Sequence, residues 1–264
     1  MNNIAFLGVG NMAGAIIGGL SDREGLEIHL FDKNPAQYDA FSGRGYICHA
    51  SAAEAVAASD YIFLSVKPQN IIELFGWLEG VPTDGKVFVS IMAGVTINRI
   101  TELLGHNAAV IRTMPNAPLL IGMGVTALSR NTAVTDEAFE FVRCIFAGLG
   151  QTLVIDESQM NAISSVTSSA PAYVYMLIKA ISDGAAEQGF DSAGLLDAVC
   201  GMVEGSARML RTSGRTPEDM IGVVASKGGT TEAALGVLRE GGLENTVRAA
   251  MSACTRRADE LSGM

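Results

Sequence analysis

The sequence predicts an α/β protein with a doubly wound sheet, followed by an all-α domain. Three observations lead to this fold class. Short strand-like runs alternate with helix-like runs in the first half of the chain, as in parallel sheets. A glycine-rich turn follows the first of these strands, and beyond Asp156 the strand-like runs stop. The predicted domains are therefore residues 1–156 and residues 157–264.

The predicted strands of the first domain are short and rich in Val, Ile, Leu and Phe. They are Ile4–Gly8, Glu27–Asp32, Tyr61–Val66, Lys86–Ile91, Ala109–Thr113, Gly122–Leu128 and Gln151–Ile155. Ala-rich or amphipathic segments between them predict helices. These helices are Met12–Leu20, Ala36–Arg44, Ser51–Ala58 and Asp136–Phe146.

Long helical patterns make up the second domain, with glycines near the predicted helix ends. The predicted helices are Gln159–Ser165, Pro171–Gln188, Ala193–Leu210, Thr230–Arg239 and Glu244–Leu261. A domain so rich in Ala, Gly and Met leaves more apolar surface than one copy can bury. We therefore expect it to be a dimerisation domain that packs against a second copy in a homodimer.

Composition excludes several classes of protein. The net charge of −10 argues against binding to nucleic acid or to an anionic membrane surface. No apolar run approaches the ~20 residues of a membrane span, and no signal-peptide pattern follows Met1. Cys48, Cys144, Cys200 and Cys254 lack CxxC spacing, so no metal site or disulfide framework is predicted. We expect them to be reduced core residues of a cytoplasmic protein.

A GxGxxA motif lies directly after the first predicted strand and opens a helix. Its residues are Gly8, Val9, Gly10, Asn11, Met12 and Ala13. Gly8 permits a tight turn, Gly10 lets a pyrophosphate approach the backbone, and Ala13 allows close helix–strand packing. The free N–H groups at the helix start favour phosphate. In this context the motif predicts a Rossmann-type dinucleotide site.

The end of the second predicted strand bears on the choice of dinucleotide. Asp32 lies there, followed by Lys33 and Asn34. A carboxylate at this point accepts a hydrogen bond from the ribose 2′-OH of NADH, whereas a cation favours the 2′-phosphate of NADPH. Both cofactors, NADPH and NADH, therefore remain open, with NADPH slightly favoured.

Further candidate cofactor-binding residues follow other strands, at the carboxyl ends where open α/β sheets bind ligands. They are Ser65, Val66, Lys67, Pro68, Ala93, Gly94 and Asn116. The prolines on either side of Asn116 restrict its turn. Lys67, taken alone, is better interpreted as a solvated loop lysine.

Six blocks of the sequence together match a known family. They are Gly8–Ala13, Ser65–Gln69, Ser90–Gly94, Arg112–Pro118, Pro171–Tyr173 and Ser226–Thr231. On these blocks the chain resembles, over nearly its whole length, the pyrroline-5-carboxylate reductase family, which catalyses the last step of proline biosynthesis. Two blocks depart from the family pattern. The family reads GSGPAY at Ser168–Tyr173 and SPGGTT at Ser226–Thr231, so that Lys227 stands where the family has proline.

The resemblance implies a site for the imine substrate, pyrroline-5-carboxylate. The residues implied to bind it are Glu157, Pro171, Ser226, Gly228, Gly229, Thr230 and Thr231, with Thr231 as the catalytic residue that hydrogen-bonds the ring nitrogen. A glycine-rich helix start can bind a carboxylate through backbone N–H groups. The alternative for Thr230 and Thr231 is simple helix capping.

The resemblance also implies a mechanism and an assembly. Hydride passes from C4 of the reduced nicotinamide to C5 of the pyrroline ring and gives L-proline, and the dimers of the family can assemble into larger rings. The second domain has no histidine and two lysines, Lys179 and Lys227. This shortage of acids suits a cyclic imine, which can enter protonated, better than a ketone. Tyr173 and the two lysines remain candidate proton donors.

Two rival functions remain. A β-hydroxyacid dehydrogenase has the same layout but uses a catalytic lysine on a GxxGxGxxK segment, which is missing here. A dinucleotide-binding sensor without turnover is the other rival, because fold does not imply function. Turnover with pyrroline-5-carboxylate separates these alternatives.

Overall fold

The computed structural model describes residues 2–21, 23–41, 43–190 and 193–263, which form two compact units. One unit is Met1–Ser169 with Cys254–Met264, and the other is Ala170–Ala253. This division lies beyond the predicted domain boundary near Asp156. The reason is that Met160 is fully buried and packs with Met114 and Ala127 of the sheet.

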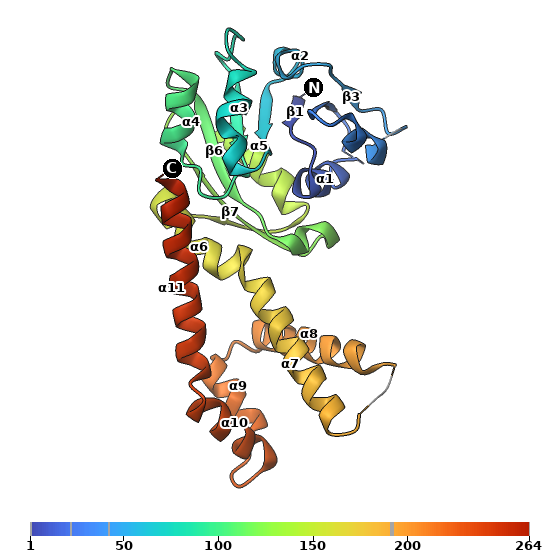
Figure 1. Ribbon diagram of the computed structural model, residues 1–264, viewed down its shortest axis with the longest axis vertical. Coiled ribbons are helices and arrows are strands. Elements are labelled where there is room, and N and C mark those ends of the chain that lie inside the picture. Colours follow the sequence, from blue (N-terminus) through green and yellow to red (C-terminus); the bar gives the residue numbers. More distant parts are fainter. Residues whose placement is uncertain (1, 22, 42, 191–192, 264) are drawn as a thin grey trace. The chain divides into compact units, whose positions relative to one another are not determined.

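The first unit contains one sheet of eight strands in the order β3-β2-β1-β4-β5-β6-β7-β8 (Figure 1). The strands are β1 Asn2–Leu7, β2 Leu26–Phe31, β3 Ile47–Cys48, β4 Tyr61–Leu64, β5 Val87–Ser90, β6 Ala109–Met114, β7 Gly124–Arg130 and β8 Gly150–Val154. Neighbouring strands are parallel except β6 and β7. The chain leaves β1 toward β2 on one side and returns to β4 on the other. This reversal creates the crevice in which open α/β sheets bind ligands.

Both faces of the sheet are covered by helices, so consecutive residues of β1 enter different cores. Ile4 and Phe6 belong to the core that includes residues of α1 and α5, whereas Ala5 and Leu7 belong to the core of α2, α3 and α4. The helices are α1 Asn11–Gly18, α2 Ala52–Ala57, α3 Ile71–Gly76, α4 Ile97–Leu104 and α5 Asp136–Ala147. The predicted doubly wound α/β fold is confirmed.

Several elements differ from the prediction. The predicted helix Ala36–Arg44 is a 3₁₀ helix over Pro35–Phe41, and its Ser42 lies outside the described residues. The short helices α3 and α4 and the two-residue strand β3 were not predicted. The β7 strand is antiparallel to β6, since a 3₁₀ turn joins the two and is too short for a parallel crossover.

The second unit has helices and no strand among its described residues. The helices are α7 Ala170–Glu187, α8 Leu195–Ser213, α9 Pro217–Val224, α10 Thr230–Glu240 and the first part of α11 Leu243–Ser262. The short helix α6 Met160–Ile163 and a π-helical turn at Ser164–Ser168 precede them in the first unit. Helix α9 was not predicted, although Pro217 opens it and Thr216 and Asp219 form a capping box.

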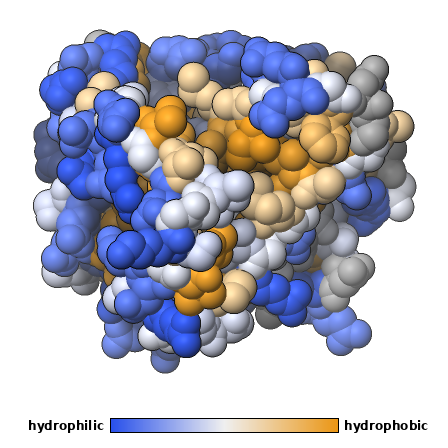
Figure 2. Space-filling model, turned by 90° about the horizontal axis from the view of Figure 1, so that it is seen from below, coloured by the Kyte–Doolittle hydropathy of each residue, from blue (hydrophilic) through white to orange (hydrophobic). Residues whose placement is uncertain are grey.

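The second unit buries little apolar surface within one chain. Among its described residues, Val199 is the one hydrophobic side chain that is buried. Its exposed large apolar side chains are Val174, Tyr175, Met176, Leu177, Ile181, Phe190, Leu196, Met202, Met209, Ile221, Val223, Val224, Val237, Leu238, Leu243 and Val247. In Figure 2, apolar areas interrupt the polar surface of the face shown. A surface of this kind indicates a protein partner.

One prediction, that the cysteines are core residues, differs from the structure. All four are free, but Cys48, Cys144 and Cys200 are exposed and Cys254 is partly buried, so the expectation of core cysteines is wrong. Cys48 lies on the edge strand β3, and Cys200 lies in the helical unit that buries little by itself. None of the described helices is long and apolar enough to cross a membrane.

Candidate active site

The turn from β1 into α1 has the geometry of a phosphate-binding turn. Gly8 has a φ of +95°, and a Cβ there would lie 2.8 Å from the backbone oxygen of Ser65. The Ser65 hydroxyl donates to the Gly8 carbonyl at 2.7 Å and joins the ends of β1 and β4. A Cβ at Gly10, by contrast, would meet nothing within 4 Å. Since no side chain caps α1, its first turn is open to an anion.

A pocket of about 300 Å³ lies at this turn. Seven predicted cofactor-binding residues line it: Gly8, Gly10, Asp32, Lys33, Ser65, Val66 and Lys67. Gln37, Asn70 and Trp77 also line it and were not predicted. Trp77 lies just past α3 and packs edge-on against Phe31, the last residue of β2. No local motif marks such residues, because the fold brings them to the pocket from separate segments.

Asp32 organises the rim of this pocket. Its Oδ2 accepts a hydrogen bond from the Val9 N–H at 2.7 Å, and its Oδ1 accepts one from the Asn34 N–H at 2.9 Å. The Tyr38 hydroxyl accepts from the Asp32 N–H at 2.7 Å. Each carboxylate oxygen still has a lone pair for a ribose hydroxyl, and the side chain is held in place.

The remaining residues of the predicted cofactor set lie outside the lining of this pocket. Asn11 and Met12 are in the first turn of α1, and Ala13 is buried against the sheet. Val9 is buried, Asn34 is exposed, and Pro68 opens a 3₁₀ turn after β4. Their contact with a cofactor stays a prediction.

Two residues of that set, Gly94 and Asn116, have contacts elsewhere in the first unit. Gly94 has a φ of +76°, and a Cβ there would lie 3.0 Å from Leu261 Cβ of α11, while its neighbour Ala93 is exposed. Asn116 is buried, its amide donating to the Thr167 carbonyl at 3.0 Å and accepting from the Val125 N–H at 2.8 Å. The Asn116 side chain therefore ties the turn after β6 to β7 and to the π-helical segment.

Glu157 belongs to a partly buried polar network around the buried Arg112. Its Oε1 accepts from the Ile97 N–H at the start of α4 at 2.6 Å and lies 3.4 Å from Nη1 of Arg112. Arg112 is 1% exposed, and its Nη2 donates to Oδ1 of Asn161 at 2.7 Å. Burial lowers the pKa of the Arg112 guanidinium below its usual value, and the adjacent Glu157 carboxylate partly offsets this effect. Asn161 in turn donates to Asp259 of α11 at 2.9 Å.

The predicted substrate segment Ser226–Thr231 connects α9 to α10 in the second unit. Gly228 has a φ of +74°, and its N–H donates to Oε2 of Glu232 at 2.6 Å. A Cβ at Gly229 would lie 2.5 Å from the Ser226 hydroxyl. Gly229 is the N-cap of α10 and offers no capping side chain. Thr230 and Thr231 are therefore in the first helical turn, and capping at the N-cap position is not their role.

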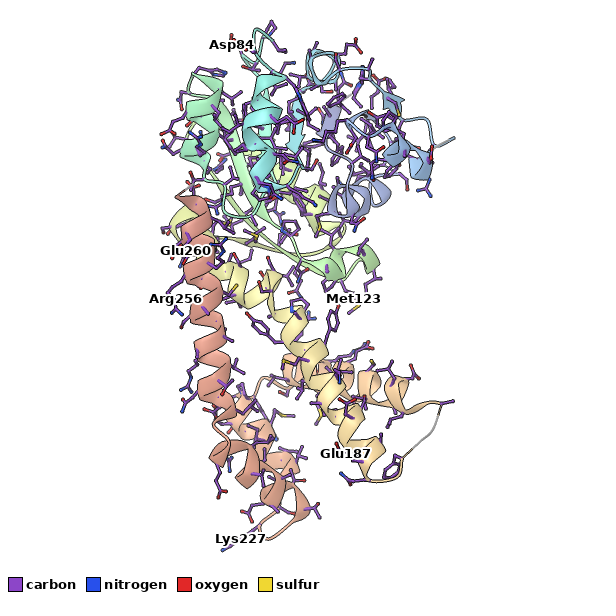
Figure 3. All side chains as sticks on the ribbon, in the orientation of Figure 1. Asp84, Met123, Glu187, Lys227, Arg256 and Glu260 are labelled. Atoms are coloured by element: carbon purple, nitrogen blue, oxygen red, sulfur yellow. The ribbon has the colours of Figure 1, made fainter. Side chains whose placement is uncertain are left out.

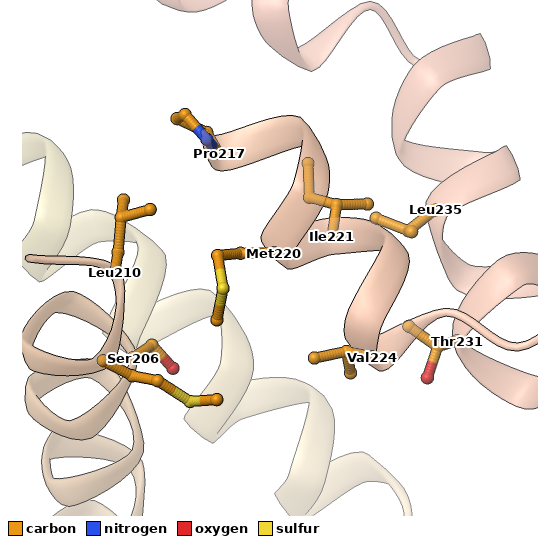
Figure 4. A pocket seen from close by; sticks show the side chains of 9 residues that line it. Ser206, Leu210, Pro217, Met220, Ile221, Val224, Thr231 and Leu235 are labelled. Carbon is orange, nitrogen blue, oxygen red and sulfur yellow. The ribbon is translucent and has the colours of Figure 1, made fainter. Parts of the chain in front are cut away.

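Thr231 also lines an apolar hollow of about 400 Å³ between α8, α9 and α10 (Figure 4). Met220, Val224 and Leu235 are among the side chains around it. Lys227 is exposed at the loop between α9 and α10 (Figure 3). Pro171 lies in the first turn of α7, in the same unit as Thr231, whereas Glu157 belongs to the first unit.

Two family models match the chain. Residues 3–94 match the model described as NADP oxidoreductase coenzyme F420-dependent, and residues 157–261 match the pyrroline-5-carboxylate reductase dimerisation model. The second match begins next to the predicted domain boundary.

Known proteins resemble the chain along its whole length. The pyrroline-5-carboxylate reductase of Escherichia coli K12 is 35% identical over 263 residues, covering 98% of each chain, and that of Pisum sativum is 33% identical, covering 98% and 96%. The crystal structure of the Streptococcus pyogenes enzyme has 29% identity and a TM-score of 0.90, covering 98% of each chain. The Plasmodium falciparum enzyme, solved with NADP bound, is 22% identical with a TM-score of 0.90, covering 99% and 98%, and supports the fold alone.

The doubly wound sheet, the open glycine turn at its switch point and the helical domain define a two-domain oxidoreductase of the Rossmann class. The chain belongs to the pyrroline-5-carboxylate reductase family.

Proposed function

We propose that this protein reduces the C=N bond of 1-pyrroline-5-carboxylate with NADPH or NADH and gives L-proline. The proposal is carried by the pocket at the switch point of the sheet, which Gly8, Gly10, Asp32 and Lys67 line together. The chain belongs to a family of pyrroline-5-carboxylate reductases. The open space at Gly10 and the held carboxylate of Asp32 fit a dinucleotide. The cytoplasmic location stays a prediction.

When bound, the reduced nicotinamide supplies the hydride for C5 of the ring. The start of α1 holds the pyrophosphate through backbone N–H groups, and Asp32 orients the adenosine ribose. The first turn of α10 binds the substrate carboxylate, while Glu232 keeps the loop in shape by accepting from the Gly228 N–H. The Thr231 hydroxyl accepts a hydrogen bond from the N–H of the protonated ring imine. Positioning of this kind supplies most of the catalysis.

Glu157 and Pro171 are weaker members of the substrate site. The Glu157 carboxylate already accepts from the Ile97 backbone and pairs with Arg112, so its main role in this proposal is structural. Pro171 fixes the backbone in the first turn of α7.

Purified protein is expected to oxidise NADPH or NADH when pyrroline-5-carboxylate is added, as followed by nicotinamide absorbance. In Thr231→Ala we expect kcat/KM to fall about 10- to 100-fold, the range for one lost hydrogen bond to a charged group. Thr132→Ala, which removes the same atoms from an exposed loop threonine of the sheet unit, is the matched control. Cofactor binding without any turnover would contradict the reductase function and favour a sensor.

We further propose that the helical domain forms a homodimer, since its apolar side chains are exposed within one chain and it matches a dimerisation domain. Met176→Glu on α7 (75% exposed) is expected to weaken association by at least about tenfold, because a charge enters an apolar interface. Ile121→Glu in the sheet unit (74% exposed) is the control. Sedimentation measures the association and separates a dimer from the larger ring of dimers. A monomeric wild type would contradict the proposal.

A further inference from the structure

The rim of the dinucleotide pocket carries an ion pair that the cofactor would meet. Lys33, the residue after Asp32, and Glu73, in the first turn of α3, come from opposite sides of the sheet's switch point. Lys33 Nζ lies 3.0 Å and 3.2 Å from the two carboxylate oxygens of Glu73. The two side chains are 58% and 44% exposed. The pair is therefore held by both oxygens, but it faces solvent.

Such a pair bears on the choice between a 2′-hydroxyl and a 2′-phosphate. In Rossmann domains the residues at the end of the second strand meet the adenosine ribose, a carboxylate favouring the hydroxyl and a cation the phosphate. Asp32 cannot turn away, because the N–H groups of Val9 and Asn34 hold its two oxygens. Lys33 is the adjacent cation, and Glu73 already accepts its hydrogen bonds.

We propose that Glu73 determines cofactor specificity by holding Lys33 back from the ribose 2′ position. The proposal rests on the proposed dinucleotide site and extends it to the choice between NADH and NADPH. While paired, Lys33 contributes little net positive charge, and a 2′-phosphate must compete with the Glu73 carboxylate for it. NADH, with its 2′-hydroxyl, requires no such exchange. Because an exposed ion pair is weak, NADPH can still break it at a modest loss of affinity.

Binding of NADH and NADPH can be followed by the fluorescence of a tryptophan in the pocket. Trp77 is the single tryptophan, and it lines the same pocket. Its emission overlaps the absorption of reduced nicotinamide, so titration with NADH or NADPH reports the Kd of each without turnover. The ratio of the two Kd values isolates the 2′ position, because the rest of the two molecules is identical.

In Glu73→Gln, which keeps the shape and removes the charge, we expect the affinity for NADPH relative to NADH to rise about fivefold, the size of one exposed charge interaction. In Lys33→Gln the same ratio should fall by a similar factor. In the double variant, replacing Glu73 should have little further effect, since there is no longer a lysine to restrain. Glu140→Gln, which removes the carboxylate of the exposed ion pair with Arg143 on α5, is the matched control and should leave the ratio unchanged.

Two results would overturn the proposal: a ratio that is unchanged in Glu73→Gln, even if both Kd values change equally, or a full effect that persists without Lys33. The last would mean that Glu73 acts by direct repulsion of the phosphate. If neither cofactor binds the wild type, the dinucleotide site itself fails, which is a different outcome from an unchanged ratio.

Discussion

Replacing Gly10 with alanine is expected to weaken NADPH and NADH binding about 10- to 100-fold, which corresponds to one or two lost charge-assisted hydrogen bonds. A Cβ at Gly10 meets no atom of the protein within 4 Å, and the φ of −76° suits any residue, so Tm should remain unchanged. The added methyl group fills only the space that the pyrophosphate would enter. Quenching of Trp77 measures the affinity, and thermal unfolding measures the stability.

Two further variants make this test specific. Gly18→Ala, near the far end of the same helix, also places its Cβ in open space and should leave the affinity unchanged. Gly8→Ala should lower both stability and affinity, because its φ is +95° and its Cβ would press on the Ser65 carbonyl. Full cofactor affinity in Gly10→Ala would show that the dinucleotide does not approach the backbone at this turn.

Glu157→Leu is expected to lower the free energy of unfolding by about 3 kcal/mol, or roughly 6–12 °C in Tm, because it leaves a buried charge without its partner. Arg112 is 1% exposed and keeps only the Asn161 amide oxygen as a hydrogen-bond acceptor, while the Ile97 N–H loses its acceptor. Thermal and urea unfolding measure the change.

The double variant Arg112→Met with Glu157→Leu provides the control, since replacing both partners by apolar residues removes the uncompensated charge. We expect it to recover a large part of the lost stability. Glu140→Leu, which breaks an exposed ion pair, should change Tm by little. If Glu157→Leu lowered Tm no more than Glu140→Leu does, a structural role for Glu157 would be contradicted.

The elements near the dinucleotide turn could be predicted because their signals are local. A strand, the Gly8–Ala13 motif and a helix follow one another within a few residues, and Gly8 and Gly10 have the geometry that the motif predicts. Helix α9 could also have been predicted from the sequence, since Thr216, Pro217 and Asp219 form a recognisable helix start. Helix α3 was harder to predict, because it is short and follows a 3₁₀ turn.

The hydrogen-bond and ion-pair partners of several site residues could not be predicted from the residues next to them in the sequence. Asn116 and Glu157 appeared as ligand-binding candidates, yet their hydrogen bonds hold strands and helices together. No sequence motif marked Glu73 or Trp77, although Trp77 lines the dinucleotide pocket and Glu73 pairs with Lys33 of its lining. Polar residues far apart in the chain pair according to strand order and register, which no local pattern contains.

Local patterns in the sequence were enough to predict the doubly wound sheet, the change to helices after Asp156 and the position of the glycine turn. These features follow from hydrophobic periodicity and from the backbone freedom of glycine, both of which act over a few residues. The packing of distant segments was needed to show that β7 runs antiparallel, that the Val9 N–H holds Asp32 and that Glu73 pairs with Lys33. Such contacts depend on how distant segments pack, because hydrogen bonds and ion pairs form between neighbours in space rather than in sequence.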